Sequence, residues 1–140
     1  LGAGATFDGA AWSAGLATVS ANGAGLAMRV VEIDHVLPGA ASSTTIDVIP
    51  SHAMVFGVTG RVIAEVTGAS SFSIGIAGES ADRYGSGYGT VAGSWLRGLT
   101  SAPLTYYADT ALTLTAAGSD FTGGTVRLAV HFAELGLPRA

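Results

Sequence analysis

The sequence contains no cysteine and no lysine, and all six of its basic side chains are arginine. The absence of cysteine excludes disulfides, thiolate chemistry and cysteine-based zinc sites. The arginines form no run or stripe along the chain of the kind that neutralises nucleic-acid phosphates, so no nucleic-acid partner is predicted. They are scattered over these positions: Arg29, Arg61, Arg83, Arg97, Arg127 and Arg139.

Charge of either sign is also scarce. Charged residues make up 11% of the 140 residues, and the net charge is −4, whereas a globular domain averages about 25% charged residues. Because monomers rarely expose large, weakly polar patches, we expect other copies of the chain to cover part of the surface. The alternative is a plain surface of Ser, Thr, Gly and Ala. No apolar run reaches the length of a membrane-spanning helix, so no membrane insertion is predicted.

Apolar and polar residues alternate along most of the chain, as they do in half-buried strands. The same alternation occurs in "SFSIGI", "ALTLTA" and "TVRLAVHF", and turn-forming residues separate these segments. The pattern predicts an all-β fold, an antiparallel β-sandwich of jelly-roll type. In "MVFGVTGRVIAEVTG" it predicts this core face: Met54, Phe56, Val58, Val62 and Val66.

The first 25 residues differ from the rest because Gly and Ala dominate them. They predict a strand remnant over Thr6 to Trp12, followed by a flexible linker. We therefore expect two parts: residues 1–25, the end of a preceding domain plus a linker, and residues 26–140, the β-sandwich. The chain begins with leucine and shows no signal-peptide pattern, which is typical of a piece of a longer protein.

The stretch "GESADRYGSGYGTVAG", residues 78–93, combines glycines, tyrosines and charges. Gly87, Gly89 and Ala92 fit G-x-G-x-x-A, the pattern of a dinucleotide-binding loop. That loop requires a helix directly after it, whose N-terminus faces the pyrophosphate. Gly93 and Gly98 interrupt the candidate helix, and the neighbouring segments are predicted to be antiparallel strands. The stretch is therefore predicted to be a surface loop.

Candidate catalytic residues do not form a recognised set. His35, His52 and His131 lack metal-binding spacing, and there is no G-x-S-x-G motif. His35 and His131 lie in predicted strands, where structural pairing is the simpler interpretation. Glu32 and Asp34 share one strand face and are the best candidates for a carboxylate pair that hydrolyses glycosides. Carboxylates along a strand are more often solvated or paired with arginine.

Calcium is a further alternative, since Glu79, Asp82 and Asp109 could supply oxygen ligands. No fixed loop pattern supports it. The sequence thus predicts no enzymatic activity, no metal site and no cofactor.

A glycan-binding surface fits the stretch better. Aromatic side chains beside charged groups suit sugars, because a pyranose has an apolar C–H face and a rim of hydroxyls. The predicted ligand-binding residues are Asp82, Arg83, Tyr84, Tyr88 and Trp95. The alternative is that the aromatic rings cap the edge of the sandwich and that the glycines allow turns with positive φ.

Several longer segments resemble a family of phage-like structural proteins. "IPSHAMVFGVTGRV" is similar to the family's I-P-x-R-A-x-V-x-G-V-x-x-R-V, and "YYADTALTLTAAGSDFTGGTVRLAVHF" is similar to its Y-A-D-T-x-x-x-L-T-A-x-G-x-x-F-x-G-G-x-V-R-x-A-x-H-[FY]. "TFDGAAW" resembles V-[FY]-D-G-x-x-W at the end of the DUF2793 domain. Most of residues 6–134 therefore resembles the C-terminal domain of DUF2793-type proteins of prophages and gene transfer agents. His52 departs from the pattern, because the family has arginine there.

The resemblance implies a non-enzymatic head spike or fibre domain at the extracellular surface of a phage-like particle assembled in the bacterial cytoplasm. Such domains are usually homotrimers that bind host cell-surface polysaccharide, often the capsule, and dock onto other structural proteins of the particle. Repeated weak sugar sites on a trimer act together through avidity. The alternative is a structural connector that docks another fibre or capsid protein without meeting the host.

Overall fold

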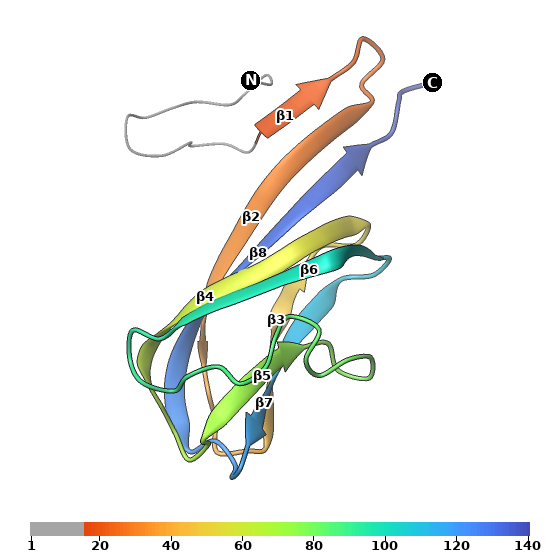
Figure 1. Ribbon diagram of the computed structural model, residues 1–140. Helices are drawn as coiled ribbons and strands as arrows, with labels where there is room; N and C mark the ends of the chain where they lie inside the picture. Colours follow the sequence, from red (N-terminus) through yellow and green to blue (C-terminus); the bar gives the residue numbers. More distant parts are fainter. Residues whose placement is uncertain (1–15) are drawn as a thin grey trace.

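The computed structural model describes residues 16–140, and this part of the chain consists of strands and loops without a helix (Figure 1). The segment Thr6 to Trp12, predicted to be a strand, lies outside the described residues. Within residues 16–140 there is accordingly no helix that could cross a membrane. The strands are β1 (Leu16–Val19), β2 (Gly25–Val36), β3 (Ser42–Ile49), β4 (Ala53–Thr67), β5 (Ser71–Gly75), β6 (Trp95–Tyr106), β7 (Thr110–Ala117) and β8 (Gly123–Gly136).

The strands form two antiparallel sheets, one of five strands in the order β1-β2-β8-β4-β6 and one of three in the order β3-β7-β5. From β2 onward, every connection between consecutive strands passes from one sheet to the other. Such crossings are typical of jelly rolls, in which two Greek keys form a double sheet. The predicted all-β sandwich is confirmed.

The core lies between the two sheets, and most predicted strand faces are confirmed. On β5, β7 and β8 the residues that the alternation selected are buried: Phe72, Ile74, Leu112, Leu114, Val126, Leu128, Val130 and Phe132. Alternate residues of these strands therefore point into the layer between the sheets, as strand geometry requires. Hydrophobic burial of this layer is the main favourable contribution to folding.

The predicted core face of β4 is wrong at its start. Ala53 and Val55 are buried there, whereas Met54 is exposed. The pairing of β4 with both β6 and β8 shifts between Val55 and Gly57, which marks a β-bulge. A bulge inserts one extra residue and reverses the phase of the alternation. Beyond it, Val58, Val62 and Val66 are buried as predicted.

One end of the five-stranded sheet extends beyond the other strands. β1, the start of β2 and the end of β8 form this arm, at the top of Figure 1. Leu16–Val19, in the region predicted to be a linker, pairs with β2. The apolar side chains exposed on the β2 and β8 part of the arm are Leu26, Met28, Val30 and Leu135. The division between two domains near residue 25 stays a prediction.

Candidate functional site

The glycine-rich stretch between β5 and β6 covers two sheet edges instead of forming a free loop. Its backbone bonds the outer edge of β5 through Tyr84 N–Ile74 O (2.9 Å), Ile74 N–Gly85 O (2.9 Å) and Tyr88 N–Phe72 O (3.0 Å). It then bonds β4 through Val66 N–Thr90 O and Val62 N–Ser94 O, both 2.8 Å. Residues 84–88 thus stand where a jelly roll has a further edge strand, and they protect that edge from pairing with other chains.

Tyr84 was predicted to contact a ligand, and the structure places it in the core instead. Its side chain is fully buried, and its hydroxyl lies 2.9 Å from that of Tyr106. Burial, together with the Tyr106 hydrogen bond, raises the pKa of Tyr84, so the phenol stays protonated. Gly98, which faces the core on β6, lets the Tyr84 backbone approach β6 closely, because a Cβ there would collide with the Tyr84 carbonyl oxygen. The structural alternative therefore holds for this tyrosine.

Three of the other predicted ligand-binding residues, Asp82, Arg83 and Tyr88, lie beside Tyr84 in the covering stretch. The half-buried Tyr88 packs on Phe72, and its hydroxyl donates to the Tyr84 carbonyl oxygen at 2.5 Å. Asp82 is exposed and accepts a hydrogen bond from Ser80 Oγ at 3.0 Å. Arg83 is half-buried, and its Nε has no hydrogen-bond partner within residues 16–140.

Trp95 is separated from these loop residues by the five-stranded sheet. Its side chain is 62% exposed, and the residue pairs with Arg61 in the ladder between β6 and β4. The next residue, Leu96, is buried, so Trp95 points away from the core. Tyr84 lies on the opposite, inner side of this sheet. Tyr84 and Trp95 therefore lie on opposite faces of the sheet, and the predicted set stays a prediction for the residues of the covering stretch.

The outer face of the five-stranded sheet contains a shallow groove of about 520 Å³. Volumes of this size are typical of sites for small ligands. Strands β2, β8, β4 and β6 contribute its lining: Glu32, Thr59, Gly60, Arg61, Ile63, Trp95, Leu96, Arg97, Arg127 and Ala129. The groove brings together three arginines that are scattered in the sequence.

Two rows of cross-strand neighbours build this groove. The first row, from β2 to β6, is Asp34, Arg127, Arg61 and Trp95. The second is Glu32, Ala129, Thr59 and Arg97. Ala129 and Thr59, the small residues in the middle of the second row, leave a depression between the larger side chains on either side. Directly opposite side chains on one sheet face lie close enough to interact.

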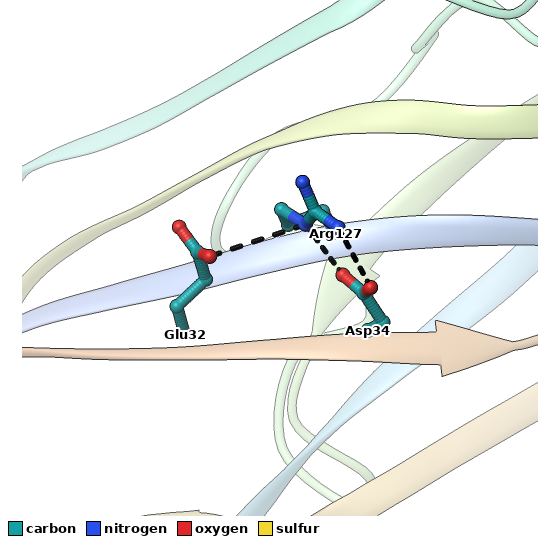
Figure 2. Close-up of polar contacts among 3 residues, drawn as sticks. All are labelled: Glu32, Asp34 and Arg127. Carbon is teal, nitrogen blue, oxygen red and sulfur yellow. Dashed lines mark hydrogen bonds and ion pairs between the residues drawn. The ribbon is translucent and has the colours of Figure 1, made fainter.

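Arg127 is held by the two carboxylates of β2. Its Nε and Nη2 donate to the two Asp34 oxygens at 2.6 and 2.8 Å, and Glu32 Oε1 lies 3.9 Å from Nε (Figure 2). The hydrogen bond from Arg127 lowers the pKa of Asp34, and the same pair raises the pKa of Arg127. A carboxyl group held ionised in this way is a poor general acid, so the geometry favours arginine pairing over glycoside hydrolysis.

Arg61 and Arg97, in contrast, form no ion pair within the part of the chain that the structure describes. Arg61 Nη1 donates to the Gly93 carbonyl oxygen at 3.1 Å. The Arg97 guanidinium carbon lies 5.3 Å from the centroid of the Trp95 ring, a cation–π distance. Among the residues that the structure describes, no carboxylate neutralises these two positive charges of the groove, which lie beside an exposed indole.

Two of the histidines, and Asp109 among the suggested calcium ligands, form side-chain hydrogen bonds. His35 Nε2 lies 2.7 Å from Ser43 Oγ, and His131 Nε2 lies 2.8 Å from Thr59 Oγ1. His52 has a positive φ of 65° in the turn before β4, a conformation in which histidine is enriched. Asp109 accepts a hydrogen bond from the Ser51 amide at 2.9 Å. Residues 16–140 contain no group of three or more side chains arranged to hold a metal.

Fold and groove define the class: an all-β sandwich domain with an arginine- and tryptophan-lined groove on its larger sheet. The fold is similar to that of a chain in the capsid asymmetric unit of cyanophage Pam1, with a TM-score of 0.53 and 24% identity over 76% of this chain and 84% of that chain. No protein-family model matches the chain, and no curated protein matches it.

Proposed function

We propose that this chain is a non-enzymatic structural domain of a phage-like particle. The observation that carries the proposal is the likeness in fold to a chain of a cyanophage capsid. The sequence motifs that resemble DUF2793-type spike and fibre proteins support the same assignment, and we propose membership in that family. The domain acts at the outer surface of the particle, where it contacts other structural proteins.

We further propose that the domain binds polysaccharide on the host cell surface. Two features of the groove support this: the exposed ring of Trp95, which offers a stacking surface for a pyranose, and neighbouring donors such as Arg61 that can bond sugar substituents. The groove is shallow and open, as suits one or two units within a long polymer. The groove shares Trp95 with the ligand-binding residues predicted from the sequence.

A homotrimeric assembly belongs to the same proposal. The arm exposes apolar side chains on the outer face of β2 and β8, among them Met28 and Leu135. Contiguous apolar surface of this kind is typical of protein–protein contacts. These contacts are made with other copies of the chain or with a neighbouring particle protein, and three copies present three grooves to the polymer.

The test is a pull-down of the purified chain on encapsulated cells of a candidate host and on an isogenic capsule-deficient strain. The mass in solution is measured alongside by light scattering. Capsule-dependent binding by a trimer is the expected result. Equal binding to both strains, or binding to neither, overturns the polysaccharide proposal. In that case, co-assembly with purified particle proteins identifies the chain as a structural connector, the role that the apolar arm also favours.

A further inference from the structure

We infer that the groove on the outer face of the five-stranded sheet binds an acidic sugar, a pyranose that carries a carboxylate, between Arg61 and Arg97. The inference rests on the proposed polysaccharide binding and adds to it the site and the chemical class of the sugar. The charges, the aromatic surface and the floor of the groove each support it.

The charges of the groove are unbalanced in a way that favours an anion. Arg127 is neutralised by Asp34, whereas Arg61 and Arg97 have no carboxylate partner within residues 16–140. The chain as a whole is acidic, with a net charge of −4, so this concentration of arginine does not reflect overall composition. A guanidinium group offers two parallel N–H donors, which match the two oxygens of a carboxylate.

The position of Arg61 opposite a second arginine is compensated on one side only, because Asp34 pairs with Arg127 and no carboxylate within residues 16–140 pairs with Arg61. Arg61 and Arg127 are direct cross-strand neighbours on β4 and β8. Like charges directly opposite each other destabilise a sheet. Departures from local rules of this kind are concentrated at functional sites. An anion bound beside Arg61 removes the repulsion, because it supplies the negative charge that Asp34 supplies to Arg127.

The aromatic surface identifies the rest of the ligand as a sugar ring. Arg97 lies over the Trp95 ring, yet the Trp95 side chain remains 62% exposed. Trp95 lines the groove, and an exposed indole there can stack on the apolar C–H face of a pyranose. A small inorganic anion has no such face and gains nothing from the indole.

The floor of the groove provides room and hydrogen-bonding groups. Ala129 and Thr59 are small and lie side by side between Glu32 and Arg97. The Thr59 hydroxyl bonds His131 Nε2, and the exposed Glu32 carboxylate can accept hydrogen bonds from sugar hydroxyls. The volume of about 520 Å³ accommodates one or two sugar units.

The experiment measures binding of the chain to oligogalacturonate by isothermal titration calorimetry. Two comparison ligands are used: the same oligomer with its carboxyl groups reduced to alcohols, and a sulfated dextran of similar length. Three variants are compared with the unmodified chain. Arg61→Gln and Arg97→Gln remove the two free charges. Arg29→Gln is the matched control, since Arg29 lies on the arm, outside the groove, and pairs with Glu134 at 3.7 Å. Thermal melts establish that every variant is folded.

The expected result is binding to oligogalacturonate that falls about tenfold or more in each groove variant and stays unchanged in Arg29→Gln. Reduction of the carboxyl groups lowers binding by a similar factor. Equal binding to sulfated dextran overturns the assignment to a carboxylate sugar and shows general anion binding. Unchanged binding in both groove variants overturns the site.

The pull-down on encapsulated cells, repeated with the same variants, separates failure of this inference from failure of the proposed function. If Arg61→Gln and Arg97→Gln bind the capsule as well as the unmodified chain does, the groove assignment is wrong and polysaccharide binding stands. If the unmodified chain binds neither capsule nor oligogalacturonate, both proposals are wrong.

Discussion

Arg61 on β4 lies directly opposite Arg127 on β8, and only Arg127 is paired with the carboxylate of Asp34. The ion pair between Arg127 and Asp34 therefore compensates for the repulsion between Arg127 and Arg61. Isolated surface ion pairs contribute little to stability. Asp34 is expected to contribute more than such a pair, because it also offsets the repulsion between Arg61 and Arg127.

Asp34→Asn is predicted to lower the melting temperature, because Arg127 then faces Arg61 without compensation. The loss is predicted to be smaller in a chain that already carries Arg61→Gln, since the repulsion is absent there. A double-mutant cycle measured by thermal unfolding checks this coupling. Glu134→Gln, which removes the partner of Arg29 on the arm, is the matched control and should show no coupling to Arg61→Gln. Equal losses in both backgrounds would contradict the argument.

Tyr84→Phe is predicted to destabilise the fold without affecting sugar binding. The substitution removes a hydroxyl that bonds Tyr106 at 2.9 Å and leaves that buried group unpaired. Loss of a buried partner costs about 1–3 kcal/mol. Tyr107→Phe is the control, because Tyr107 is 77% exposed and should change the free energy of unfolding little. Urea unfolding measures both variants, and reduced oligogalacturonate binding by folded Tyr84→Phe would return Tyr84 to the ligand site.

Gly98→Ala is predicted to destabilise the sandwich by separating the covering stretch from β6. A Cβ at Gly98 collides with the carbonyl oxygen of Tyr84, whereas one at Gly39 has its nearest neighbour, Phe121 O, at an ordinary 3.8 Å. Overpacking of this kind costs about 1–3 kcal/mol. Gly39→Ala is therefore the control and should be neutral or slightly stabilising. Proteolysis near residues 78–93 should accelerate in Gly98→Ala alone, and equal stability of the two variants would refute the predicted collision.

The alternation of side chains explains how much of this fold the sequence predicts. It predicts the sandwich and the buried faces of β5, β7 and β8, because alternation depends only on neighbours along the chain. It fails at Met54, where the bulge after Val55 is specified by pairing with two other strands. The groove was missed for the same reason: Arg61 and Arg127 become neighbours only through the register between β4 and β8. Their positions on the polar faces of strands were the available signal.

Stability is predicted to decrease as the pH falls below the ordinary pKa of histidine, about 6.5. Burial lowers the pKa of His35, so the folded chain binds a proton there less readily than the unfolded chain does. The stabilising contribution is complete above pH 6.5 and is lost as the pH falls toward the lower pKa of the folded state. Thermal melts between pH 7.5 and 5 measure this slope. His35→Gln should flatten it, and an unchanged slope would assign the effect to other groups.

The apolar arm is predicted to join copies of the chain. Met28 and Leu135 are exposed on the same face of β2 and β8, beyond the part of the sheet that the second sheet covers. If this face joins copies of the chain, Met28→Asp should reduce the mass in solution to that of a monomer, because it places an unpaired charge in an apolar contact. Ile46→Asp is the control, since Ile46 is exposed on β3, in the three-stranded sheet. Light scattering distinguishes the outcomes, and an unchanged mass in Met28→Asp would place the self-contact elsewhere. A monomeric Met28→Asp chain should also bind the capsule more weakly than the trimer, because one groove replaces three linked ones.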